Sequence, residues 1–245
     1  MAKGSLDGRS ALIIGGKLAN GIGAAVARRM AAEGARVAVG DLDNAASHDS
    51  ADMLQLECDV RNDASVASAI QSVISRFGKL DILVNNASIA AGSDPLVDLS
   101  FDRWDRIIEV NLKGVALAMK HALPHMIERK YGRIINTASQ LAHKPAPGKA
   151  AYCAAKAGVV ALTVSVAQEV ADKGITVNCV CPGPTATQMW VNTDEKWKAW
   201  KAAQLPIGRV GTPDEVASAY VYLATDEASF MIGQSLSPNG GDVMW

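Results

Sequence analysis

The sequence lacks long apolar runs and an excess of charge of either sign. No stretch of eighteen or more apolar residues is free of charge, and residues 1–8 are mixed in charge without the apolar core of a signal peptide. Lysine plus arginine (24) and aspartate plus glutamate (25) leave a net charge of −1. These absences argue against a membrane or a nucleic acid as a partner, so we expect a cytoplasmic protein.

Cysteine is scarce and is not arranged to hold a metal. The four cysteines show neither C-x-x-C spacing nor a suitably spaced histidine, so we expect free, mostly buried thiols and no metal. They are Cys58, Cys153, Cys179 and Cys181. Repeats, linkers and low-complexity tracts are also absent, whereas 49% hydrophobic residues among 245 can build a substantial core. Residues 1–245 are therefore predicted to form a single domain.

Apolar runs of strand length alternate with amphipathic helical segments. Strands are expected at residues 10–14, 36–40, 54–60, 80–84, 133–138 and 175–180, with a last strand and turn within 233–241. Helices are expected at residues 22–30, 64–77, 101–130 (with a kink at Pro124), 150–170 and 213–224. The alternation predicts an α/β fold, a doubly wound (Rossmann) parallel sheet flanked by helices, with its site at the carboxyl ends of the strands.

A glycine-rich turn joins the first strand to the first helix. Gly15 and Gly16 follow the strand, and Gly21 and Gly23 flank the start of the helix. Glycines let the backbone approach a pyrophosphate closely, and a helix N-terminus offers unpaired N–H groups and a partial positive charge. The order of strand, turn and helix is typical of a dinucleotide site. Lys17 in this turn either contacts a phosphate or is solvated.

Three residues of the middle of the chain have the chemistry for proton transfer. Ser139 ends a buried strand, and Tyr152 and Lys156 are four residues apart on an alanine-rich helix, so they share a face. A cation one helical turn away lowers the pKa of a tyrosine and makes it a better acid or base near neutrality. A hydroxyl at Ser139 can meanwhile bind a substrate oxygen.

Ser139, thirteen residues before Tyr152-x-x-x-Lys156, resembles the active-site signature of the short-chain dehydrogenase/reductase family. The resemblance implies that Tyr152 is the acid or base, that Ser139 fixes the substrate oxygen, and that Lys156 also holds the nicotinamide ribose. It further implies that Asn111 supports a water in the proton relay. The chain departs from the family pattern in a glycine loop one residue longer than usual and in Ser88, which follows Asn85-Asn86-Ala87 where glycine is usual.

The acid Asp41 after the second strand bears on the cofactor. In this position a carboxylate accepts hydrogen bonds from the adenosine ribose and repels the extra phosphate of NADP, which favours NAD. A basic Lys17 favours NADP, which remains the alternative cofactor. Together with the resemblance, the pattern assigns the cofactor to Gly15, Gly16, Lys17, Gly21, Ile22, Gly23, Asp41, Leu42, Asp59, Val60, Asn86, Ala87, Tyr152, Lys156, Pro182, Gly183, Thr185 and Thr187.

Residues 188–206 concentrate tryptophan among lysines and polar residues. Trp190, Trp197 and Trp200 lie in this stretch, and two interpretations are open, core packing or a movable lid over the substrate. The family resemblance places the substrate lid here. The residues assigned to the substrate are Gln140, Leu141, His143, Met189 and Trp190. His143 is either a further acid or base or a solvated loop residue.

The sequence predicts an NAD(H)-dependent oxidoreductase that transfers a hydride between nicotinamide and a secondary alcohol or ketone, a small-molecule substrate. An alternative within the family is an NADPH-dependent 3-oxoacyl-(acyl-carrier-protein) reductase. An alternative outside the family's enzymes is a non-catalytic, NAD-sensing protein. Epimerases and dehydratases are disfavoured, because they need larger substrate domains than 245 residues allow. The tail ends on Trp245, a large aromatic that a monomer rarely exposes, so we expect a homotetramer with this tail at an interface.

Overall fold

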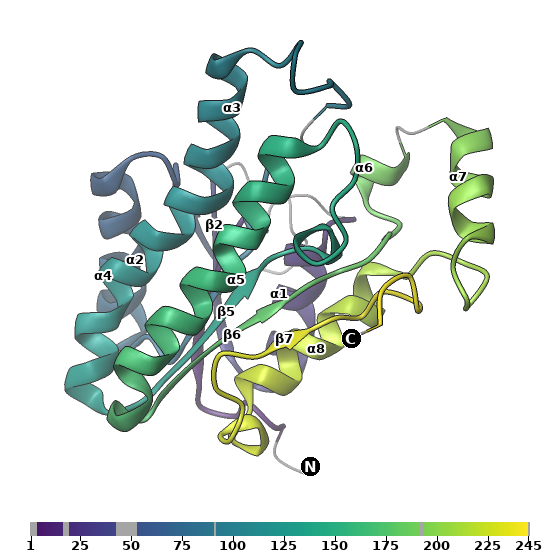
Figure 1. Cartoon of the computed structure of the whole chain (residues 1–245). Helices are drawn as coiled ribbons and strands as arrows, with labels where there is room; N and C mark the ends of the chain where they lie inside the picture. Colours follow the sequence, from purple (N-terminus) through teal and green to yellow (C-terminus); the bar gives the residue numbers. More distant parts are fainter. Residues whose placement is uncertain (1–3, 17–19, 43–52, 91, 192–193, 245) are drawn as a thin grey trace.

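A computed structural model describes residues 4–16, 20–42, 53–90, 92–191 and 194–244 of the chain (Figure 1). The predictions for Lys17 and for Trp245 lie outside these residues, as does most of the segment between Asp41 and the third strand. The backbone of Met189 lies in a helix, but its side chain is outside the described part.

Seven parallel strands form one sheet in the order β3-β2-β1-β4-β5-β6-β7. The strands are β1 (Ser10–Ile14), β2 (Arg36–Asp41), β3 (Leu54–Glu57), β4 (Ile82–Asn85), β5 (Gly132–Thr137), β6 (Ile175–Val180) and β7 (Ser235–Leu236). This arrangement confirms the predicted doubly wound parallel sheet. Three of the central strands, β1, β4 and β5, are buried along their whole length, as expected for strands covered on both faces.

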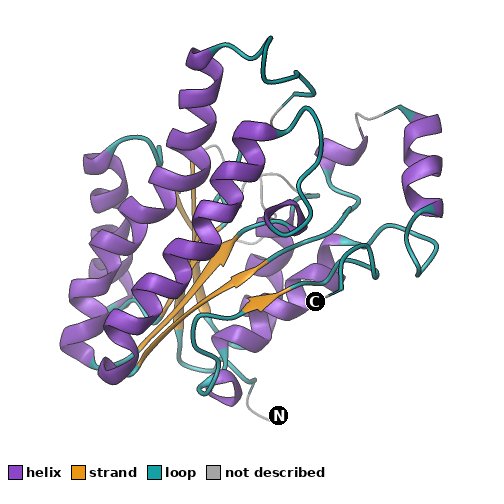
Figure 2. Cartoon of the chain, in the orientation of Figure 1, coloured by secondary structure: helices purple, strands orange, loops and turns teal. Residues whose placement is uncertain are grey.

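Helices cover both faces of the sheet (Figures 1 and 2). The longer ones are α1 (Ile22–Ala32), α2 (Asp63–Phe77), α3 (Phe101–Ile108), α4 (Gly114–Arg129), α5 (Ala150–Val170) and α8 (Pro213–Ala224). The shorter elements are the π turn η1 (Glu109–Lys113), η2 (Gln140–Ala142), η3 (Ala171–Lys173), α6 (Gln188–Val191), α7 (Glu195–Ala203) and η4 (Asp226–Ala228).

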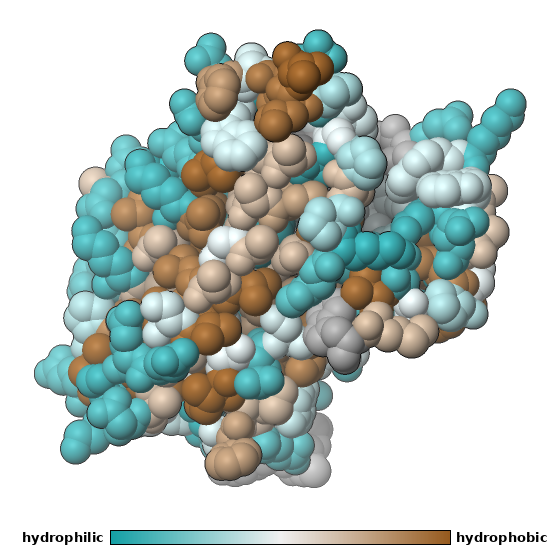
Figure 3. All heavy atoms as spheres, viewed as in Figure 1, coloured by the Kyte–Doolittle hydropathy of each residue, from teal (hydrophilic) through white to brown (hydrophobic). Residues whose placement is uncertain are grey.

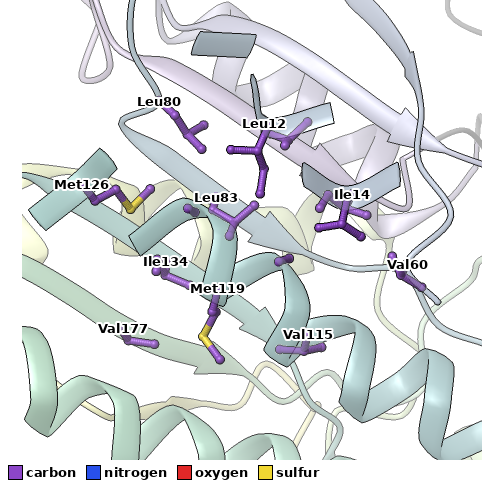
Figure 4. Close-up of a cluster of buried hydrophobic side chains, with 14 of the residues drawn as sticks. Leu12, Ile14, Val60, Leu80, Leu83, Val115, Met119, Met126, Ile134 and Val177 are labelled. Carbon is purple, nitrogen blue, oxygen red and sulfur yellow. The ribbon is translucent and has the colours of Figure 1, made fainter. Parts of the chain in front are cut away.

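The two faces bury separate hydrophobic clusters. On one face, α2, α4 and α5 contribute residues such as Val73, Met119 and Val159 to a cluster with Leu12, Leu83 and other strand residues (Figure 4). On the other face, α1 and α8 pack on the strands through a second cluster. Burial of these side chains is the main stabilising contribution of the sheet. Each fully buried large aliphatic side chain contributes about 1.5–3 kcal/mol.

The sheet has its switch point between β1 and β4. From β1 the chain builds β2 and β3 on one side, and from β4 it builds the remaining strands on the other side. Loops that leave the carboxyl ends of β1 and β4 therefore diverge, and such a point is where open α/β sheets bind ligands. Every segment assigned to chemistry follows the carboxyl end of a strand or faces one.

The helix predicted at residues 101–130 differs from expectation in where it is interrupted. The α-helical pattern changes at the π turn Glu109–Lys113, and Pro124 lies inside the continuous helix α4. The interruption therefore lies at the π turn, and the kink expected at Pro124 stays a prediction. A π turn adds one residue to a helical turn. Here the turn carries Asn111, whose buried side chain is hydrogen-bonded to the backbone of Ile89.

Two further elements show how sequence sets local structure. Helix α8 begins as predicted, because Thr212 and Glu215 form a reciprocal capping box and Pro213 occupies the first helical turn. By length and composition alone, residues Ala150–Lys173 are apolar enough to cross a membrane. Helix α5 packs on the sheet through Val159 and Ala167, and a core helix passes the same test.

Candidate active site

Ser139 and Tyr152 meet at the carboxyl end of β5. Ser139 follows this strand, is 7% exposed, and accepts a hydrogen bond of 3.1 Å at Oγ from the N–H of Leu141. Tyr152 lies in the first turn of α5, and the Ser139 hydroxyl faces its phenol closely enough to lower the phenol pKa. The rigid strand end and the helix start thus place a hydroxyl against a phenol, as their spacing predicted.

Lys156 lies one turn further along α5 and is buried, with 1% of its surface exposed. Its Nζ donates a 2.7 Å hydrogen bond to the carbonyl oxygen of Thr137 and is 5.7 Å from the centroid of the Tyr152 ring. Burial disfavours the charged amine and lowers the pKa of Lys156 from 10.5 to about 8. At neutral pH the side chain therefore remains mostly cationic, although at a desolvation cost.

The pKa of Tyr152 is set mainly by burial, which raises it above the ordinary value. The hydroxyls of Ser139 and Ser88 oppose this shift and lower the pKa. The Lys156 amine donates to the Thr137 carbonyl, and the lowering of the Tyr152 pKa predicted from this cation stays a prediction. The hydroxyls of Ser139 and Ser88 are the groups that lower the phenol pKa against the effect of burial.

Asn111 is fixed from two sides by the segment after β4. Its Oδ1 accepts from the N–H of Ile89 at 2.9 Å, and its Nδ2 donates to the carbonyl oxygen of Ile89 at 3.0 Å. With both side-chain functions engaged and no exposed surface, Asn111 links η1 to the loop that carries Ser88. The described contacts show this asparagine bridging backbone groups of Ile89. Its part in a water relay stays a prediction.

The glycine turn after β1 forms a cradle that side chains would fill. Gly15 has a φ of +89°, and a Cβ at this position would lie 2.3 Å from the backbone nitrogen of Ala87. A Cβ at Gly23 would lie 2.3 Å from the carbonyl oxygen of Gly15. Asn86 Nδ2 donates to that same carbonyl at 2.6 Å and ties the turn to the end of β4.

This cradle fits the pyrophosphate of a dinucleotide. Gly21 caps α1 without a side-chain hydrogen bond, and Ile22 is its first helical residue, so N–H groups of the first turn have no side-chain cap. Gly16 packs against Val39, where a Cβ would approach a Val39 methyl to 2.8 Å. The turn is therefore held by small residues, and an anion can approach the helix start closely.

The acids predicted for the adenosine end lie at the ends of β2 and β3. Asp41 ends β2, and its Oδ1 accepts from the N–H of Leu42 at 2.9 Å. Asp59 is paired with Arg61, whose Nη2 lies 2.6 Å from Oδ2, and these hydrogen bonds lower the pKa of the carboxyl despite partial burial. Val60 is 8% exposed and belongs to the hydrophobic cluster under α4, so only part of it can contact a ligand.

The turn after β6 closes the nicotinamide end of the predicted site. The carbonyl oxygen of Pro182 accepts from the N–H of Gln140 at 3.1 Å, which joins this turn to the segment that begins with Ser139. Thr185 is 8% exposed and donates from Oγ1 to the carbonyl oxygen of Gly183 at 2.9 Å. The N–H of Thr187 then donates to the carbonyl oxygen of Thr185 at 2.7 Å, so the predicted residues form one compact turn.

The tryptophans of residues 188–206 do not pack into a core. Trp197 and Trp200 on α7 are 46% and 57% exposed, which makes the core-packing interpretation wrong for both. Their ring centroids lie 6.3 Å apart, and Trp190 on α6 lies 5.6 Å from Trp197. The three rings form an aromatic row outside the sheet, where α6 and α7 lie apart from the main body (Figure 1).

A carboxylate that the sequence did not single out joins the predicted substrate segment to α7. Asp242, with 3% of its side chain exposed, accepts from Gln140 at 2.5 Å, from Lys144 at 3.0 Å and from Lys201 at 2.6 Å. Burial raises the pKa of Asp242, but these hydrogen bonds hold it below the ordinary value. The only advance signal was an acid directly after a Gly240-Gly241 turn, which does not reveal partners 41 to 102 residues away.

The cysteines and His143 lie beside the site. All four cysteines are free and buried, as predicted. His143 Nε2 lies 3.8 Å from Sγ of Cys181, behind the turn after β5. Within the part of the chain that the structure describes, no group of three or more potential metal ligands occurs.

The fold and these contacts define an α/β protein with a glycine turn that fits a dinucleotide, a buried Ser139 after β5, and a partly buried Tyr152 and a buried Lys156 on α5. A family model described as enoyl-(acyl carrier protein) reductase matches residues 16–242. The chain is 42% identical to the cis-4-hydroxycyclohexanecarboxylate dehydrogenase of Sinomonas cyclohexanicum, over 91% of this chain and 92% of the relative. It is 39% identical to a 3-oxoacyl-(acyl-carrier-protein) reductase of Salmonella typhimurium, over 98% and 99% of the two chains.

A third relative, a hydroxy(phenyl)methylsuccinyl-CoA dehydrogenase subunit of Thauera aromatica, is 40% identical over 96% of this chain and 97% of its own. The chain belongs to the short-chain dehydrogenase/reductase family of oxidoreductases. The resemblance drawn from Ser139, Tyr152 and Lys156 is thereby confirmed at the level of the family.

Proposed function

We propose that this protein is an NAD(H)-dependent oxidoreductase that interconverts a secondary alcohol and a ketone. The observation that carries the proposal is the buried contact between the hydroxyl of Ser139 and the phenol of Tyr152, with the Lys156 amine 5.7 Å from the same ring. When bound, NAD would serve as the hydride acceptor in oxidation of the alcohol carbon, and NADH would serve as the hydride donor in reduction. The remaining steps belong to side chains of this chain.

Tyr152 accepts the hydroxyl proton during oxidation and returns it during reduction, while Ser139 holds the substrate oxygen. Lys156 binds the nicotinamide ribose from a position fixed by the Thr137 carbonyl, and it supplies positive charge near the phenolate. Asn111 supports the water through which the proton reaches solvent. Gln140, Leu141, His143, Met189 and Trp190 contact the substrate.

For the cofactor we propose NAD, because a carboxylate at Asp41 binds a ribose diol and repels a 2′-phosphate. NADP is the alternative. If it is the cofactor, the activity most strongly favoured is 3-oxoacyl thioester reduction, which is the activity named for the Salmonella typhimurium relative. The names of two other relatives, a cyclohexanecarboxylate dehydrogenase and a CoA-thioester dehydrogenase, support oxidation of a hydroxyl on a larger acid or acyl substrate.

The test is a spectrophotometric screen of NADH formation across cyclic hydroxy acids, hydroxyacyl thioesters, polyols and cyclic alcohols, repeated with NADP. Wild type and Tyr152→Phe are compared throughout, so that contaminating activity is recognised. NADH formation that Tyr152→Phe abolishes supports the proposal. Activity only with NADPH and acyl thioesters contradicts it in favour of the reductase, and cofactor binding without any turnover contradicts it in favour of an NAD-sensing protein.

We further propose a cytoplasmic homotetramer with the C-terminal tail at an interface. Met244 in the tail is 77% exposed and Phe230 is 97% exposed. Apolar atoms also gather along α5 (Figure 3), where Val164 is 38% exposed beside a surface hollow that includes Ala161. Large exposed apolar areas of this kind are typical of subunit contacts. Light scattering that gives a monomeric mass contradicts this part of the proposal.

A further inference from the structure

Asp242 holds two separate segments of the predicted substrate site. Its side chain is 3% exposed, and its Oδ2 accepts hydrogen bonds from Gln140 Nε2 at 2.5 Å and from Lys201 Nζ at 2.6 Å. Gln140 directly follows Ser139, whereas Lys201 lies on α7. One carboxylate oxygen therefore joins the segment that begins with Ser139 to the helix that carries two tryptophans.

The turn that carries Asp242 is fixed by the side chain of Asn239. Nδ2 of Asn239 donates to the carbonyl oxygen of Val243 at 2.8 Å, and its Oδ1 accepts from the N–H of Gly241 at 2.8 Å. These bonds hold the backbone on both sides of Asp242, and Asn239 itself is 7% exposed. The Asp242 carboxylate is thus a fixed support to which the two segments are attached.

Gln140 depends on Asp242 for the orientation of its side-chain amide. Its Nε2 donates to the carboxylate, and its buried Oε1 has no hydrogen-bond partner within the part of the chain that the structure describes. A carboxylate only accepts hydrogen bonds, so it fixes the amide with the NH2 group toward Asp242. Because a buried polar group without a partner is destabilising, we expect weakening of this acceptor to displace Gln140.

Displacement of Gln140 would reach the hydroxyl of Ser139. The N–H of Gln140 donates to the carbonyl oxygen of Pro182 at 3.1 Å, and the N–H of Leu141 donates to Ser139 Oγ at 3.1 Å. The bond from Leu141 occupies a lone pair of the serine oxygen and leaves the serine proton to donate. The short turn η2 therefore sets the direction of the hydroxyl that we propose to hold the substrate oxygen.

Two ammonium groups keep the Asp242 carboxylate ionised. Lys201 contacts Oδ2, and Lys144 donates at 3.0 Å both to Oδ1 and to the Asp242 carbonyl oxygen. Burial raises the pKa of Asp242, but the hydrogen bonds from Lys201, Lys144 and Gln140 hold it below its ordinary value. The carboxylate is therefore charged at neutral pH, and the hydrogen bonds that it accepts are charge-assisted and strong.

We propose that Asp242 is a positioning residue of the active site. Through Gln140 it sets the direction of the Ser139 hydroxyl, and through Lys201 it sets the position of α7. The proposal rests on the proposed oxidoreductase function, in which Asp242 acts through these partners and takes no proton from the substrate. Because the two segments share one carboxylate, a change at Asp242 should affect both segments, whereas a change at either partner should affect one.

Amide hydrogen exchange tests this link without a substrate. In Asp242→Asn we expect exchange to quicken about tenfold both in residues 139–144 and in α7, because a neutral amide is a weaker acceptor than a carboxylate. Gln140→Met should quicken exchange only in the first segment, and Lys201→Met only in the second. Asp172→Asn, which removes an exposed acid of η3, is the matched control and should quicken neither. Exchange in α2 should be the same in all variants.

Steady-state kinetics with NAD and an alcohol that wild type oxidises tests the consequence for catalysis. Gln140→Met should lower kcat about tenfold, because the Ser139 hydroxyl is no longer held in its productive direction. Asp242→Asn should lower kcat by a similar factor and also raise KM, since it weakens the attachment of α7 as well. Adding Gln140→Met to Asp242→Asn should lower kcat by less than about twofold further, because both changes act on the same hydrogen bond.

Each result supports or overturns a stated claim. Unchanged exchange in residues 139–144 of Asp242→Asn overturns the positioning role, as does exchange that quickens equally in α2. Losses of kcat that multiply in the double variant overturn it as well. Gln140→Met retains the contact between Lys201 and Asp242, so it tests the link to Ser139 even where Asp242→Asn is unstable. The expected exchange pattern without NADH formation from any alcohol supports the link through Asp242 and refutes the proposed function.

Discussion

Lys156 donates its hydrogen bond to the carbonyl oxygen of Thr137, 2.7 Å away, and its amine is thereby anchored to the end of β5. This bond compensates in part for the burial of a cation, which is the main cause of the lowered Lys156 pKa. A pKa lowered from 10.5 to about 8 corresponds to a cost of about 3 kcal/mol for holding the charge in the folded protein. The buried charge at this position therefore reduces stability.

Lys156→Met should therefore make the protein more stable and inactive. Methionine fills a similar volume without the charge, so we expect a gain of about 1–3 kcal/mol in the free energy of unfolding at pH 7, a rise of several degrees in Tm, and a loss of about 100-fold or more in turnover. Thermal unfolding and NADH formation measure the two effects.

The gain in stability of Lys156→Met over wild type should shrink as pH rises. The folded pKa lies below the unfolded one, so the cost of burial is fully present below about pH 8 and disappears as pH rises from about 8 toward 10.5. Wild type should accordingly approach the stability of Lys156→Met in that window. A difference that stays constant between pH 7 and 10 contradicts the account of a desolvated lysine.

Asn86→Ala should weaken cofactor binding. The side chain donates at 2.6 Å to the carbonyl oxygen of Gly15 and holds the glycine turn against β4. We expect the Kd for NAD to rise about tenfold, measured by titration calorimetry. Asn62→Ala is the matched control: it removes the N-cap of α2, should lower stability by about 1 kcal/mol, and should leave the Kd unchanged. Equal weakening in both variants would mean that general destabilisation, not the turn, is being measured.

Asp41→Ser should shift cofactor preference. Without the carboxylate, NAD loses its ribose contact and NADP loses a repulsion, so the ratio of Kd values should move toward NADP by about tenfold or more. Asp172→Ser removes an exposed acid in η3, before β6 and away from the carboxyl ends of the strands, and should change neither affinity. An unchanged ratio in Asp41→Ser would show that another residue selects the cofactor.

Lys201→Met should loosen the segment that carries the tryptophans. Its amine joins α7 to the buried carboxylate of Asp242 at 2.6 Å. Because a charge-assisted bond of this kind contributes about 1.5–3 kcal/mol, we expect KM for the substrate to rise by about three- to tenfold with a smaller change in kcat, and faster trypsin cleavage within residues 188–206. Lys198→Met, which removes an ion pair with Glu195 in the same helix and leaves the Asp242 contact in place, is the control. Equal effects of the two variants argue against the Asp242 contact as the cause.

The fold was predictable because its strands and helices have clear hydrophobic periods. Tyr152 and Lys156 could be grouped from spacing, since they lie one helical turn apart, whereas Ser139 was joined to them through the resemblance to the family signature. The clamp on Asp242 could not, because it joins residues about one hundred positions apart through side chains of ordinary surface type. The exposure of Trp197 and Trp200 was equally hidden, because helical spacing is the same for a buried face and an outward one.

The direction of the Lys156 amine shows a second limit. Sequence places the lysine one turn from Tyr152 but does not show that the Thr137 carbonyl will take its hydrogen bond. Local patterns thus predict which elements form, whereas contacts across the sheet edge decide what each side chain does.

The most direct measurement is NADH formation by Tyr152→Phe with an alcohol that wild type oxidises, alongside its Kd for NADH. Removing the phenol oxygen removes the group that takes the substrate proton, so turnover should fall by about 100-fold or more while the Kd for NADH stays within about twofold of wild type. Turnover close to that of wild type would contradict the assignment of Tyr152. Loss of turnover together with NADH binding would show that this tyrosine maintains the structure of the site and does not perform its chemistry.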